Sequence, residues 1–552
     1  MKNTQIIDKN SKYIVSAAEM KRCDECTINH FKVPQNVLME RAALSLCALL
    51  LEKAGKNARV TVFAGSGNNG GDGIAAARLL HQEGCEVLLV LVNHQTGKLT
   101  DACKLQLEIA ENYGVEIISF DQMKDSRRVK NSDFIIDAML GIGCSRELSG
   151  EYRKAAEFIN ESSSADRDRR PIVIAADIPT GVNADTGEIC GSAVRADYTV
   201  TFGFMKLGHK LFPGSEYAGE IILKPVGITK DGFLDDYPEI RYIDTLDEKV
   251  ISKDSAGKGR TSGKIKALLP KRNPSGNKGS FGKVFIVAGS RKVSGAMLMS
   301  AETALRSGAG MVKIFTDKEN LHSVQTLLPE AMIDVYDSDK LEGSSKKSEN
   351  YAIEVTDMLK KSIDWCDAIV CGPGIGTEGT GALLVKTVLE HADKKLVLDA
   401  DALNIIAAND ELREAFIKYS GDKVITPHLA EFSRLAGKPV AECKKNILTL
   451  PVVLAKEFHA SIICKDARSI ITDGKSVYIN MSGNDGMATA GSGDVLSGLL
   501  GALVCLPYGS IYEAAVVSCY LHGTAGDIAA DKLGKSVMTA RDISEALKSI
   551  FA

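Results

Sequence analysis

Short apolar segments alternate with helix-like segments along most of the chain, and turns rich in glycine or polar residues separate them. Strands of a parallel sheet that is covered on both faces appear in sequence as continuous apolar runs. Regular alternation of such runs with helices is typical of α/β proteins. We therefore predict parallel strands at Val60–Ala64, Val87–Val92, Phe134–Ala138, Ile172–Ala176, Tyr198–Phe202, Val284–Ala288, Met311–Phe315, Ala368–Cys371, Leu396–Leu398, Val424–Thr426 and Ser461–Cys464.

One long polar segment interrupts this alternation. From about Asp244 to Ser280 the chain is rich in lysine, serine and glycine, which is typical of a linker between domains. A chain of 552 residues is also too long for one ordinary core. We predict one domain at 1–235 and a second at 245–552, both α/β. Two further polar segments, Glu161–Arg170 and Asp337–Asn350, are expected to be surface loops.

Charge and cysteine usage narrow the class of protein. The chain has 67 Lys and Arg against 71 Asp and Glu, so it lacks a basic excess for broad binding to a phosphate backbone, and nucleic acid is not an expected partner. No apolar run approaches the roughly 20 residues of a membrane helix, and the opening MKNTQIIDKN lacks the apolar core of a signal peptide. Thirteen scattered cysteines, an odd number, indicate reduced thiols and a cytoplasmic location.

A Cys-x-x-Cys spacing occurs at Cys23 and Cys26, with His30 nearby. A structural metal site needs about four ligands, and the chain has no second such pair. Ser16 and Glu19 have the spacing of a helix capping box, which would place both thiols on one face of a helix. We therefore favour two thiols that face the core over a metal site.

The glycine-rich segment GSGNNGGDG, residues 65–73, follows the predicted strand Val60–Ala64 and precedes a helical run. A glycine-rich turn of this kind exposes backbone N–H groups at the positive end of a helix, where phosphate binds. Five glycines, two asparagines and an aspartate in nine residues are more than a plain tight turn requires. The segment is therefore a candidate phosphate cradle.

Two more predicted strands of the first domain end in acids, Asp137 and Asp177. Because parallel strands end at one edge of the sheet, these acids are expected to converge with Asn68, Asn69 and Asp72. Carboxylate and amide oxygens could hold a cation. One carboxylate could instead transfer a proton, or either aspartate could only cap a helix.

The second domain has a similar segment, Asn484–Asp494, before the apolar helical run VLSGLLGALV. Its N–H groups could hold an anion, and Asp494 could act as a base beside it, as phosphoryl transfer requires. The alternative is a turn in which Asp494 only complements the helix dipole. Lys465–Ser469 could bind phosphate or be a solvated hairpin. Cys371–Gly376 is a second candidate cradle, and His428 lies with Glu431 at a strand end.

The motifs GSGNNGGDG, DAMLGIG and ADIPTG resemble those of the NAD(P)H-hydrate epimerase family over about residues 10–230. The resemblance implies a Rossmann-like three-layer αβα fold that interconverts the R and S epimers of the hydrate. It implies that Asp177 acts in proton transfer, and that Asn69, Asp137 and Thr180 bind K⁺. It further implies substrate contacts by Asn68, Asn69, Gly70, Gly71, Asp72, Gly141, Ile142, Gly143, Cys144, Ser145, Arg146, Glu147 and Tyr152.

The segments NKGSFGKVFIVAGS, SGAMLMSAETALRSGAG and LVLDADALN resemble the ADP/ATP-dependent NAD(P)H-hydrate dehydratases over about residues 260–552. This resemblance implies a ribokinase-like αβα fold, with Asp494 at the hydroxyl of the hydrate. Ala430 and Ala490 stand where those proteins usually have glycine, and a methyl group is tolerated there only if φ is negative. The implied hydrate contacts are Ala296, Gly374 and His428. The implied nucleotide contacts are Lys465, Asp466, Ala467, Arg468, Ser469, Asn484, Asp485, Gly486, Met487, Ala488, Thr489, Ala490, Gly491, Ser492 and Gly493.

Together the two resemblances imply an enzyme that repairs hydrated NADH and NADPH. Its first domain would equilibrate the epimers, and its second would dehydrate the S epimer while converting ADP to AMP and phosphate. Phosphorylation would turn the C6 hydroxyl, a poor leaving group, into a good one. ADP is favoured over ATP, Mg²⁺ is expected with the nucleotide, and a homo-oligomer is expected. The alternative is a ribokinase-like small-molecule kinase with a non-catalytic N-terminal binding domain.

Overall fold

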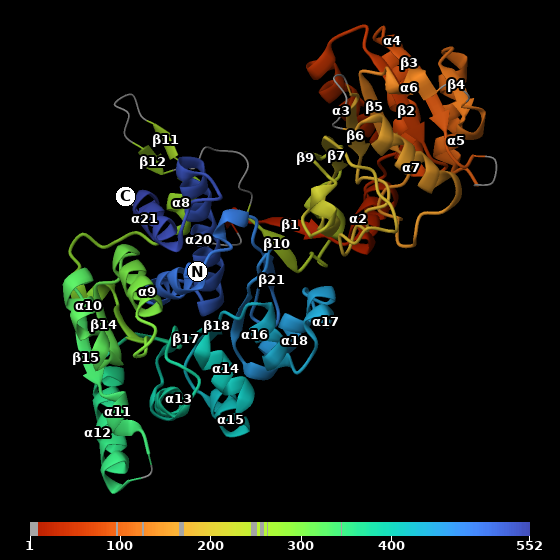
Figure 1. Ribbon diagram of the computed structural model, residues 1–552. Coiled ribbons are helices and arrows are strands. Elements are labelled where there is room, and N and C mark those ends of the chain that lie inside the picture. Colours follow the sequence, from red (N-terminus) through yellow and green to blue (C-terminus); the bar gives the residue numbers. More distant parts are fainter. Residues whose placement is uncertain are drawn as a thin grey trace. The chain divides into compact units, whose positions relative to one another are not determined.

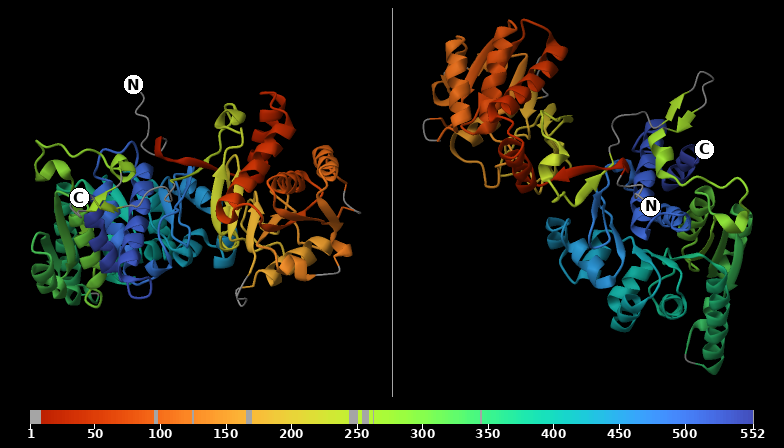
Figure 2. Two further views of the ribbon diagram at one scale, coloured as in Figure 1. Left: turned by 90° about the horizontal axis from the view of Figure 1, so that it is seen from above. Right: turned by 180° about the vertical axis from the view of Figure 1, so that it is seen from behind.

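The computed structural model describes residues 9–94, 98–123, 126–164, 170–243, 251–253, 259–261, 263–343 and 345–551. The chain forms two compact units, one of Tyr13–Pro238 and one built on Glu239–Ala552. Each unit has its own sheet and its own helices, drawn red to yellow in the first and green to blue in the second (Figure 1 and Figure 2). The predicted α/β fold class is confirmed.

The N-terminal sheet has seven parallel strands in the order β4-β3-β2-β5-β6-β7-β9. This is the Rossmann order. The order in which strands are added across the sheet reverses between the strands that come first and fourth in sequence, and a crevice lies at their carboxyl ends. Here the crevice lies after β2 and β5, where Ala64 is opposite Ala138. The strands are β2 (Arg59–Ala64), β3 (Glu86–Leu91), β4 (Glu116–Ser119), β5 (Phe134–Ala138), β6 (Ile172–Ala176), β7 (Tyr198–Phe202) and β9 (Glu220–Lys224).

Helices cover both faces of this sheet. Val60 and Val62 of β2 pack in one apolar cluster with helices α3, α4 and α5, whereas Phe63 packs in a second cluster with α7. A parallel pairing also joins β1 (Lys12–Val15) to β8 (Met205–Lys206). The helices are α2 (Ala17–Asn29), α3 (Gln35–Ala54), α4 (Asn68–Gln82), α5 (Asp101–Asn112), α6 (Ser126–Lys130) and α7 (Gly150–Ser162), with short 3₁₀ turns η1 (Phe120–Gln122), η2 (Leu207–His209), η3 (Gly214–Glu216) and η4 (Lys230–Phe233).

The capping box at the start of α2 is present as predicted. Ser16 Oγ accepts a hydrogen bond from Glu19 N at 3.2 Å, and the Glu19 carboxylate accepts one from Ser16 N at 2.8 Å. Cys23 is buried in the core and Cys26 is half-buried on the same helix. The spacing of these two cysteines is therefore that of a helix that packs one side against η4, where Cys23 Sγ lies 3.5 Å from Thr229 O.

The C-terminal sheet has the order β15-β14-β13-β16-β17-β18-β19-β20-β21-β10. It is parallel from β15 to β19, and β20 and β21 extend it as antiparallel strands. Its strands are β13 (Lys283–Val287), β14 (Met311–Asp317), β15 (Met332–Tyr336), β16 (Ala368–Cys371), β17 (Lys395–Leu398), β18 (Lys423–Ile425), β19 (Ser461–Cys464), β20 (Ile470–Thr472), β21 (Val477–Ile479) and β10 (Ile240–Tyr242).

The apolar helix predicted after Asp494 lies against this sheet. A Cβ added at Gly498 would lie 2.0 Å from Ser300 O, and one added at Gly501 would lie 2.5 Å from Val370. These two glycines therefore allow α19 to approach α9 and β16 closely. The helices are α8 (Gly263–Leu268), α9 (Gly295–Arg306), α10 (Leu321–Leu327), α11 (Ser338–Leu341), α12 (Lys346–Trp365), α13 (Gly379–His391), α14 (Asp401–Ala408), α15 (Asp410–Lys418), α16 (Leu429–Ala436), α17 (Val440–Lys445), α18 (Leu450–Phe458), α19 (Ser492–Leu503), α20 (Ile511–Leu533) and α21 (Ala540–Phe551), with 3₁₀ turns η5 (Lys278–Phe281), η6 (Lys318–Asn320) and η7 (Asp485–Met487).

The polar segments differ in part from prediction. The expected loop Asp337–Asn350 contains α11 and the first turn of α12, because Ser345 caps α12 by accepting a hydrogen bond from Ser348 N. The expected loop Glu161–Arg170 begins inside α7, and its residues 165–169 lie outside the described residues. The predicted linker holds strands β11 (Ile251–Lys253) and β12 (Gly259–Thr261) as well as α8, and part of it lies outside the described residues. Within the described ranges, no helix combines the length and apolarity needed to cross a bilayer.

Candidate active sites

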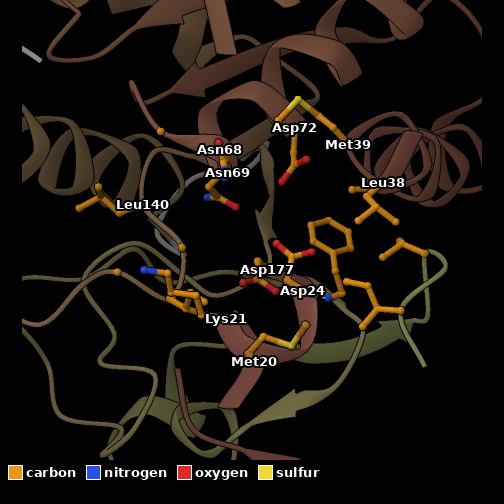
Figure 3. A pocket seen from close by; sticks show the side chains of 18 of the residues that line it. Met20, Lys21, Asp24, Leu38, Met39, Asn68, Asn69, Asp72, Leu140 and Asp177 are labelled. Carbon is orange, nitrogen blue, oxygen red and sulfur yellow. Dashed lines mark hydrogen bonds between the residues drawn. The ribbon is translucent and has the colours of Figure 1, made fainter. Parts of the chain in front are cut away.

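A cavity of about 410 Å³ opens at the carboxyl edge of the N-terminal sheet. Its wall combines apolar side chains from α2 and α3 with the start of α4 and the loop after β5 (Figure 3). The volume lies in the range of small-molecule sites. The predicted site residues that line it are Asn68, Asn69, Asp72, Gly141, Ile142, Gly143 and Asp177.

The glycine-rich segment turns directly into a helix. Helix α4 begins at Asn68, earlier than the sequence pattern indicates. A Cβ added at Gly65 would lie 2.0 Å from Met139 O, and one added at Gly70 would lie 1.8 Å from Gly65 O. At Gly73 it would lie 2.3 Å from the Ala138 methyl group. These glycines therefore bring the helix against the end of β5, and this packing presents Asn68, Asn69 and Asp72 to the cavity.

Asp177 follows β6 and has a φ of 64°, which is rare for a residue other than glycine. Three groups donate hydrogen bonds to its Oδ1: Lys206 Nζ at 2.5 Å, Thr201 Oγ1 at 3.2 Å and Phe202 N at 3.3 Å. His209 Nε2 lies 2.8 Å from its backbone oxygen. A strained backbone at a strand end, held by this many contacts, is typical of a functional site.

Lys206 determines the charge of this carboxyl. Burial by itself would raise the pKa of Asp177, but the ammonium of Lys206 and its hydrogen bond outweigh burial and hold the pKa below its ordinary value. Lys206 is itself 1% exposed. Burial, together with the charge of Lys206, lowers the pKa of His209 to about 3. The site therefore combines an ionised Asp177 with a neutral His209.

Two further carboxyl groups, of Asp72 and Asp24, point toward Asp177 from α4 and α2 (Figure 3). Burial and then the charge of Asp177 raise the pKa of Asp24. Burial, followed by the charges of Asp177 and Asp24, raises the pKa of Asp72 well above its ordinary value. The cavity thus holds carboxyl groups with opposite pKa shifts, which is a common arrangement in acid–base catalysis.

Asp137 and Thr180 lie together beneath the loop after β5. The Asp137 carboxylate is fully buried and accepts hydrogen bonds from Thr180 N at 2.8 Å, Thr180 Oγ1 at 2.7 Å and Met139 N at 3.2 Å. Burial raises its pKa to about 6, although these hydrogen bonds act in the opposite direction. The buried Nδ2 of Asn69 has no hydrogen-bond partner among the described residues.

The other predicted contacts of this domain do not line the cavity. Gly70 and Gly71 are buried within α4, and Cys144 is buried in an apolar cluster. The hydroxyl of Tyr152 lies 3.5 Å from Ser66 Oγ, beside the glycine-rich turn. The three remaining residues are exposed: Ser145, Arg146 and Glu147.

In the C-terminal domain, Asp494 lies in the first turn of α19. Burial raises its pKa to about 7, and the charge of Asp399 acts in the same direction, against that of Lys465. A carboxyl group that is partly ionised near neutral pH is well matched to general base catalysis.

Asp399 is central to this second site, although sequence analysis did not single it out. It follows β17, and its Oδ1 lies 2.9 Å from Lys465 Nζ while Ser497 Oγ donates to Oδ2 at 2.5 Å. Ala400 follows it with a φ of 52°. Burial would raise the pKa of Asp399, but Lys465 and the hydrogen bond from Ser497 hold it below its ordinary value. An acid at the carboxyl end of a buried strand was the available signal, as at Asp137 within β5 and Asp177 after β6.

The predicted hydrate contacts of this domain are partly brought together. A Cβ built on Gly374, whose φ is 67°, would lie 3.2 Å from the Ala296 methyl, so these two residues are neighbours. His428 caps α16 by accepting hydrogen bonds at Nδ1 from Ala430 N and Glu431 N. Its backbone pairs with that of Lys465.

The predicted nucleotide loop, Asn484–Gly493, is at least partly exposed throughout. Asp527 of α20 holds its start, accepting hydrogen bonds from Gly483 N and Asn484 Nδ2, both at 2.9 Å. Gly493 lies beside Lys465, since an added Cβ would be 3.2 Å from Lys465 Nζ. Neither Ala430 nor Ala490 is among the described residues with positive φ, so the methyl groups at these positions are tolerated.

Comparison with known proteins covers both domains. Residues 35–208 match the family described as YjeF-related protein N-terminus, and residues 284–549 match the family described as NAD(P)H-hydrate dehydratase. The bifunctional NAD(P)H-hydrate repair enzyme Nnr of Thermofilum pendens is 35% identical over 532 residues, which is 96% of this chain and 94% of that one. The enzyme of the same name from Moorella thermoacetica is 32% identical over 546 residues, 97% of this chain and 96% of that one.

A solved structure, the ADP/ATP-dependent NAD(P)H-hydrate dehydratase of Bacillus subtilis co-crystallised with ATP and Mg²⁺, is 26% identical. It covers 52% of this chain and 95% of that one, with a TM-score of 0.43.

Fold and sites together define a two-domain α/β enzyme with acid–base groups after β6 in one domain and at the start of α19 in the other. Its relatives match it over nearly their whole length. The chain belongs to the family of bifunctional NAD(P)H-hydrate repair enzymes, with an N-terminal epimerase domain and a C-terminal ADP-dependent dehydratase domain. The alternative of a small-molecule kinase with a non-catalytic N-terminal domain is set aside, because the relatives that match nearly the whole chain are named bifunctional NAD(P)H-hydrate repair enzymes.

Proposed function

We propose that the N-terminal cavity is where the hydrate is epimerised, and that Asp177 accepts the proton of its C6 hydroxyl. The observation that supports this most is the ion pair between Asp177 and Lys206 in the cavity wall, because it keeps a half-buried carboxylate ionised and available as a base. Asn68, Asn69 and Gly141–Gly143 would contact the dinucleotide from the same edge of the sheet.

We propose that K⁺ binds between Asn69, Asp137 and Thr180. The residues fit a cation, because Asp137 is fully buried without a cationic partner among the described residues, and its donors are neutral N–H and O–H groups. Leu140 O lies 3.3 Å from Thr180 Oγ1 and offers another oxygen. The Asn69 amide, whose Nδ2 is unpartnered, would present Oδ1 to the ion after a flip. K⁺ would supply positive charge beside the substrate.

In the C-terminal domain we propose Asp494 as the base at the C6 hydroxyl. As that oxygen bonds to the β-phosphorus of ADP, its proton passes to Asp494 and AMP leaves. The C6–O bond then breaks, phosphate departs with the bonding electrons, and loss of the C5 proton restores the dihydropyridine ring. A pKa of about 7 leaves Asp494 substantially ionised at neutral pH.

The adenine nucleotide is proposed to lie along Asn484–Gly493 and Lys465–Ser469. The N-terminus of α19 would hold its phosphates through backbone N–H groups. No group of three His, Cys, Asp or Glu suited to a metal occurs in the described ranges. Mg²⁺ therefore fits here as an ion held mainly by the phosphate oxygens of the bound nucleotide.

The proposal is tested with separated R and S hydrates and the full-length enzyme. We expect ADP to support dehydration of the S hydrate, with AMP and phosphate formed in step with the recovered dinucleotide. The R hydrate should be repaired only through prior epimerisation. Dehydration at full rate without any nucleotide would contradict the proposal. A cytoplasmic location, for which the thirteen scattered cysteines argue, and a homo-oligomeric state remain predictions.

A further inference from the structure

The N-terminal cavity contains an unusual number of acids for its size. Asp24 comes from α2, Asp72 from α4 and Asp177 from the end of β6, and the three carboxyl groups point toward one another (Figure 3). The cationic side chain that pairs with one of them is Lys206, at the end of β8. Lys21 also lines the cavity, but Lys206 is the lysine that forms an ion pair with one of the three acids among the described residues. Burial in a largely apolar cavity disfavours the ionised form of a carboxyl group that lacks such a partner.

The hydrogen bonds decide which carboxyl group keeps its charge. Asp177 receives three, one of them charged, from Lys206, Thr201 and Phe202. Among the residues that the structure describes, none donates a hydrogen bond to the carboxyl group of Asp72 or forms an ion pair with it. Asp72 also faces two other acids. It is therefore the group on which a proton is most stable, whereas Asp177 is the group on which negative charge is most stable.

Epimerisation at C6 needs both kinds of group. C6 bears a hydroxyl group and the ring nitrogen N1, so its configuration changes if the C6–N1 bond opens to an aldehyde and closes again on the other face. Opening requires a base for the hydroxyl proton and an acid for N1. Expulsion of the hydroxyl instead would form a C6 cation that can lose its C5 proton, which is dehydration and the task of the other domain.

We propose that Asp72 is the general acid of the epimerase, acting opposite Asp177, with Lys206 as the positioning residue that keeps Asp177 ionised. This rests on the proposed function of the cavity as the epimerase site. Asp177 takes the hydroxyl proton, the electrons of the C6–N1 bond move to N1, and Asp72 gives its proton to N1. After rotation about C5–C6 the ring closes: N1 attacks the aldehyde carbon, its proton returns to Asp72, and Asp177 returns a proton to oxygen. The cycle consumes no other reactant.

The pKa shifts agree with this assignment. Burial and the neighbouring acids raise the pKa of Asp72 well above its ordinary value, and Lys206 lowers that of Asp177. Asp72 also lies in the same turn of chain as Asn68 and Asn69, whereas Asp24 belongs to α2. The titratable or charged groups that face the pair from the surrounding elements are Lys21, Asp24, Cys103, Lys206 and His209.

The test measures R-to-S epimerisation by the full-length enzyme as a function of pH. Wild-type kcat should decrease on the alkaline side as Asp72 loses its proton, and on the acid side as Asp177 gains one. Asp72→Asn keeps the shape but cannot give a proton, so kcat should fall about 10²–10⁴-fold with a small change in KM, and the residual rate should lose the alkaline decrease. In Lys206→Met the acid limb should move to higher pH.

Control variants and a second assay separate the outcomes. Asp101→Asn makes the same change in the first turn of the neighbouring helix α5, where the side chain is exposed, and should leave the profile unchanged. Limited proteolysis of Tyr13–Pro238 reports that the N-terminal domain of each variant is folded, and dehydration of pure S hydrate reports that the C-terminal domain is intact. If Asp177→Asn retains epimerisation, the proposed function of the cavity fails. Two results would overturn only the role of Asp72, provided that Asp177→Asn is inactive. One is an Asp72→Asn variant that keeps the alkaline decrease in rate. The other is an Asp24→Asn variant that loses this decrease. The wild-type profile needs no variant, and its failure to decrease at alkaline pH would also overturn that role.

Discussion

Replacement of Lys465 by Met should destabilise the C-terminal domain by an amount that depends on pH. Lys465 Nζ lies 2.9 Å from Asp399 Oδ1, and the side chains are 21% and 2% exposed, so the pair is buried. Methionine retains most of the packing volume but leaves the Asp399 carboxylate without a cationic partner among the described residues. Its remaining side-chain hydrogen bonds come from Ser497 and Thr426. Breaking a buried pair on one side typically costs about 3–5 kcal/mol.

The structure also sets an upper bound to this cost. The variant can always avoid the unpaired charge by protonating Asp399, which for a carboxyl of ordinary pKa costs about 4 kcal/mol at pH 7 and about 1.5 kcal/mol at pH 5. In the wild type the pKa of Asp399 is lowered, so the ion pair with Lys465 stabilises the folded state fully at both pH values. This stabilisation is lost only as pH falls through the lowered pKa. In the variant that pKa is raised, so stability decreases as pH rises. Asp494, whose pKa Lys465 also lowers, changes in the same direction.

We therefore expect a loss of about 3–4 kcal/mol at pH 7 that decreases to about 1.5 kcal/mol at pH 5. The chain has a single tryptophan, Trp365 at the end of α12, so tryptophan fluorescence during urea unfolding reports the C-terminal domain. The double variant Lys465→Met/Asp399→Leu, which removes both charges, should recover part of the loss. A loss below about 1 kcal/mol at pH 7, or one that is equal at both pH values, would refute the reasoning.

Other predictions concern the two active sites. Asp494→Asn should slow dehydration by about 10²–10⁴-fold, while R and S hydrates still equilibrate. Asp177→Asn should leave repair of pure S hydrate normal, and a racemate should then be repaired with a fast phase of about half the total amplitude. A one-site enzyme would lose both activities in either variant. Because Asp494 must be deprotonated to act as a base, the dehydration rate at saturating ADP should increase with pH and reach half its maximum near pH 7, as a pH–rate profile will show. Asp137→Ala should weaken K⁺ activation of epimerisation with little effect on dehydration; crystals soaked in a heavier monovalent cation that show no peak beside Asp137 in the wild type would contradict this role.

The sequence was sufficient for the buried strands and for the glycine-rich turns. Strands β5, β6, β7, β16 and β19 begin and end at the predicted residues, because strands covered on both faces are continuous apolar runs. Strands at the edges, such as β4, β9 and β15, were not predicted, since their faces are half exposed and their apolar pattern is broken by charges. The lysine-rich start of α12 was taken for a loop because exposed helical turns have no apolar period.

Site residues divide along the same line. Asp137 and Asp177 stand at the carboxyl ends of strands and Asp494 follows a glycine-rich turn, so local sequence carries their signal. Lys206, which holds Asp177, occurs in the unremarkable segment GFMKLG, and only the return of the chain to β8 brings it to the cavity. Asp24, on α2, is likewise brought to the cavity by tertiary contacts that its local sequence does not indicate. Sequence therefore indicates the groups that can react, whereas the partners that set their charge emerge from tertiary contacts.

The two domains, each with its own sheet and its own site, are encoded in one chain. Each molecule of this protein consequently carries one epimerase site and one dehydratase site, at any rate of transcription or level of mRNA. Changes in expression scale both activities together and cannot alter their ratio. Any build-up of the R hydrate then depends on the relative turnover numbers of the two sites, so natural variation in that balance is expected in coding sequence and not in regulatory sequence.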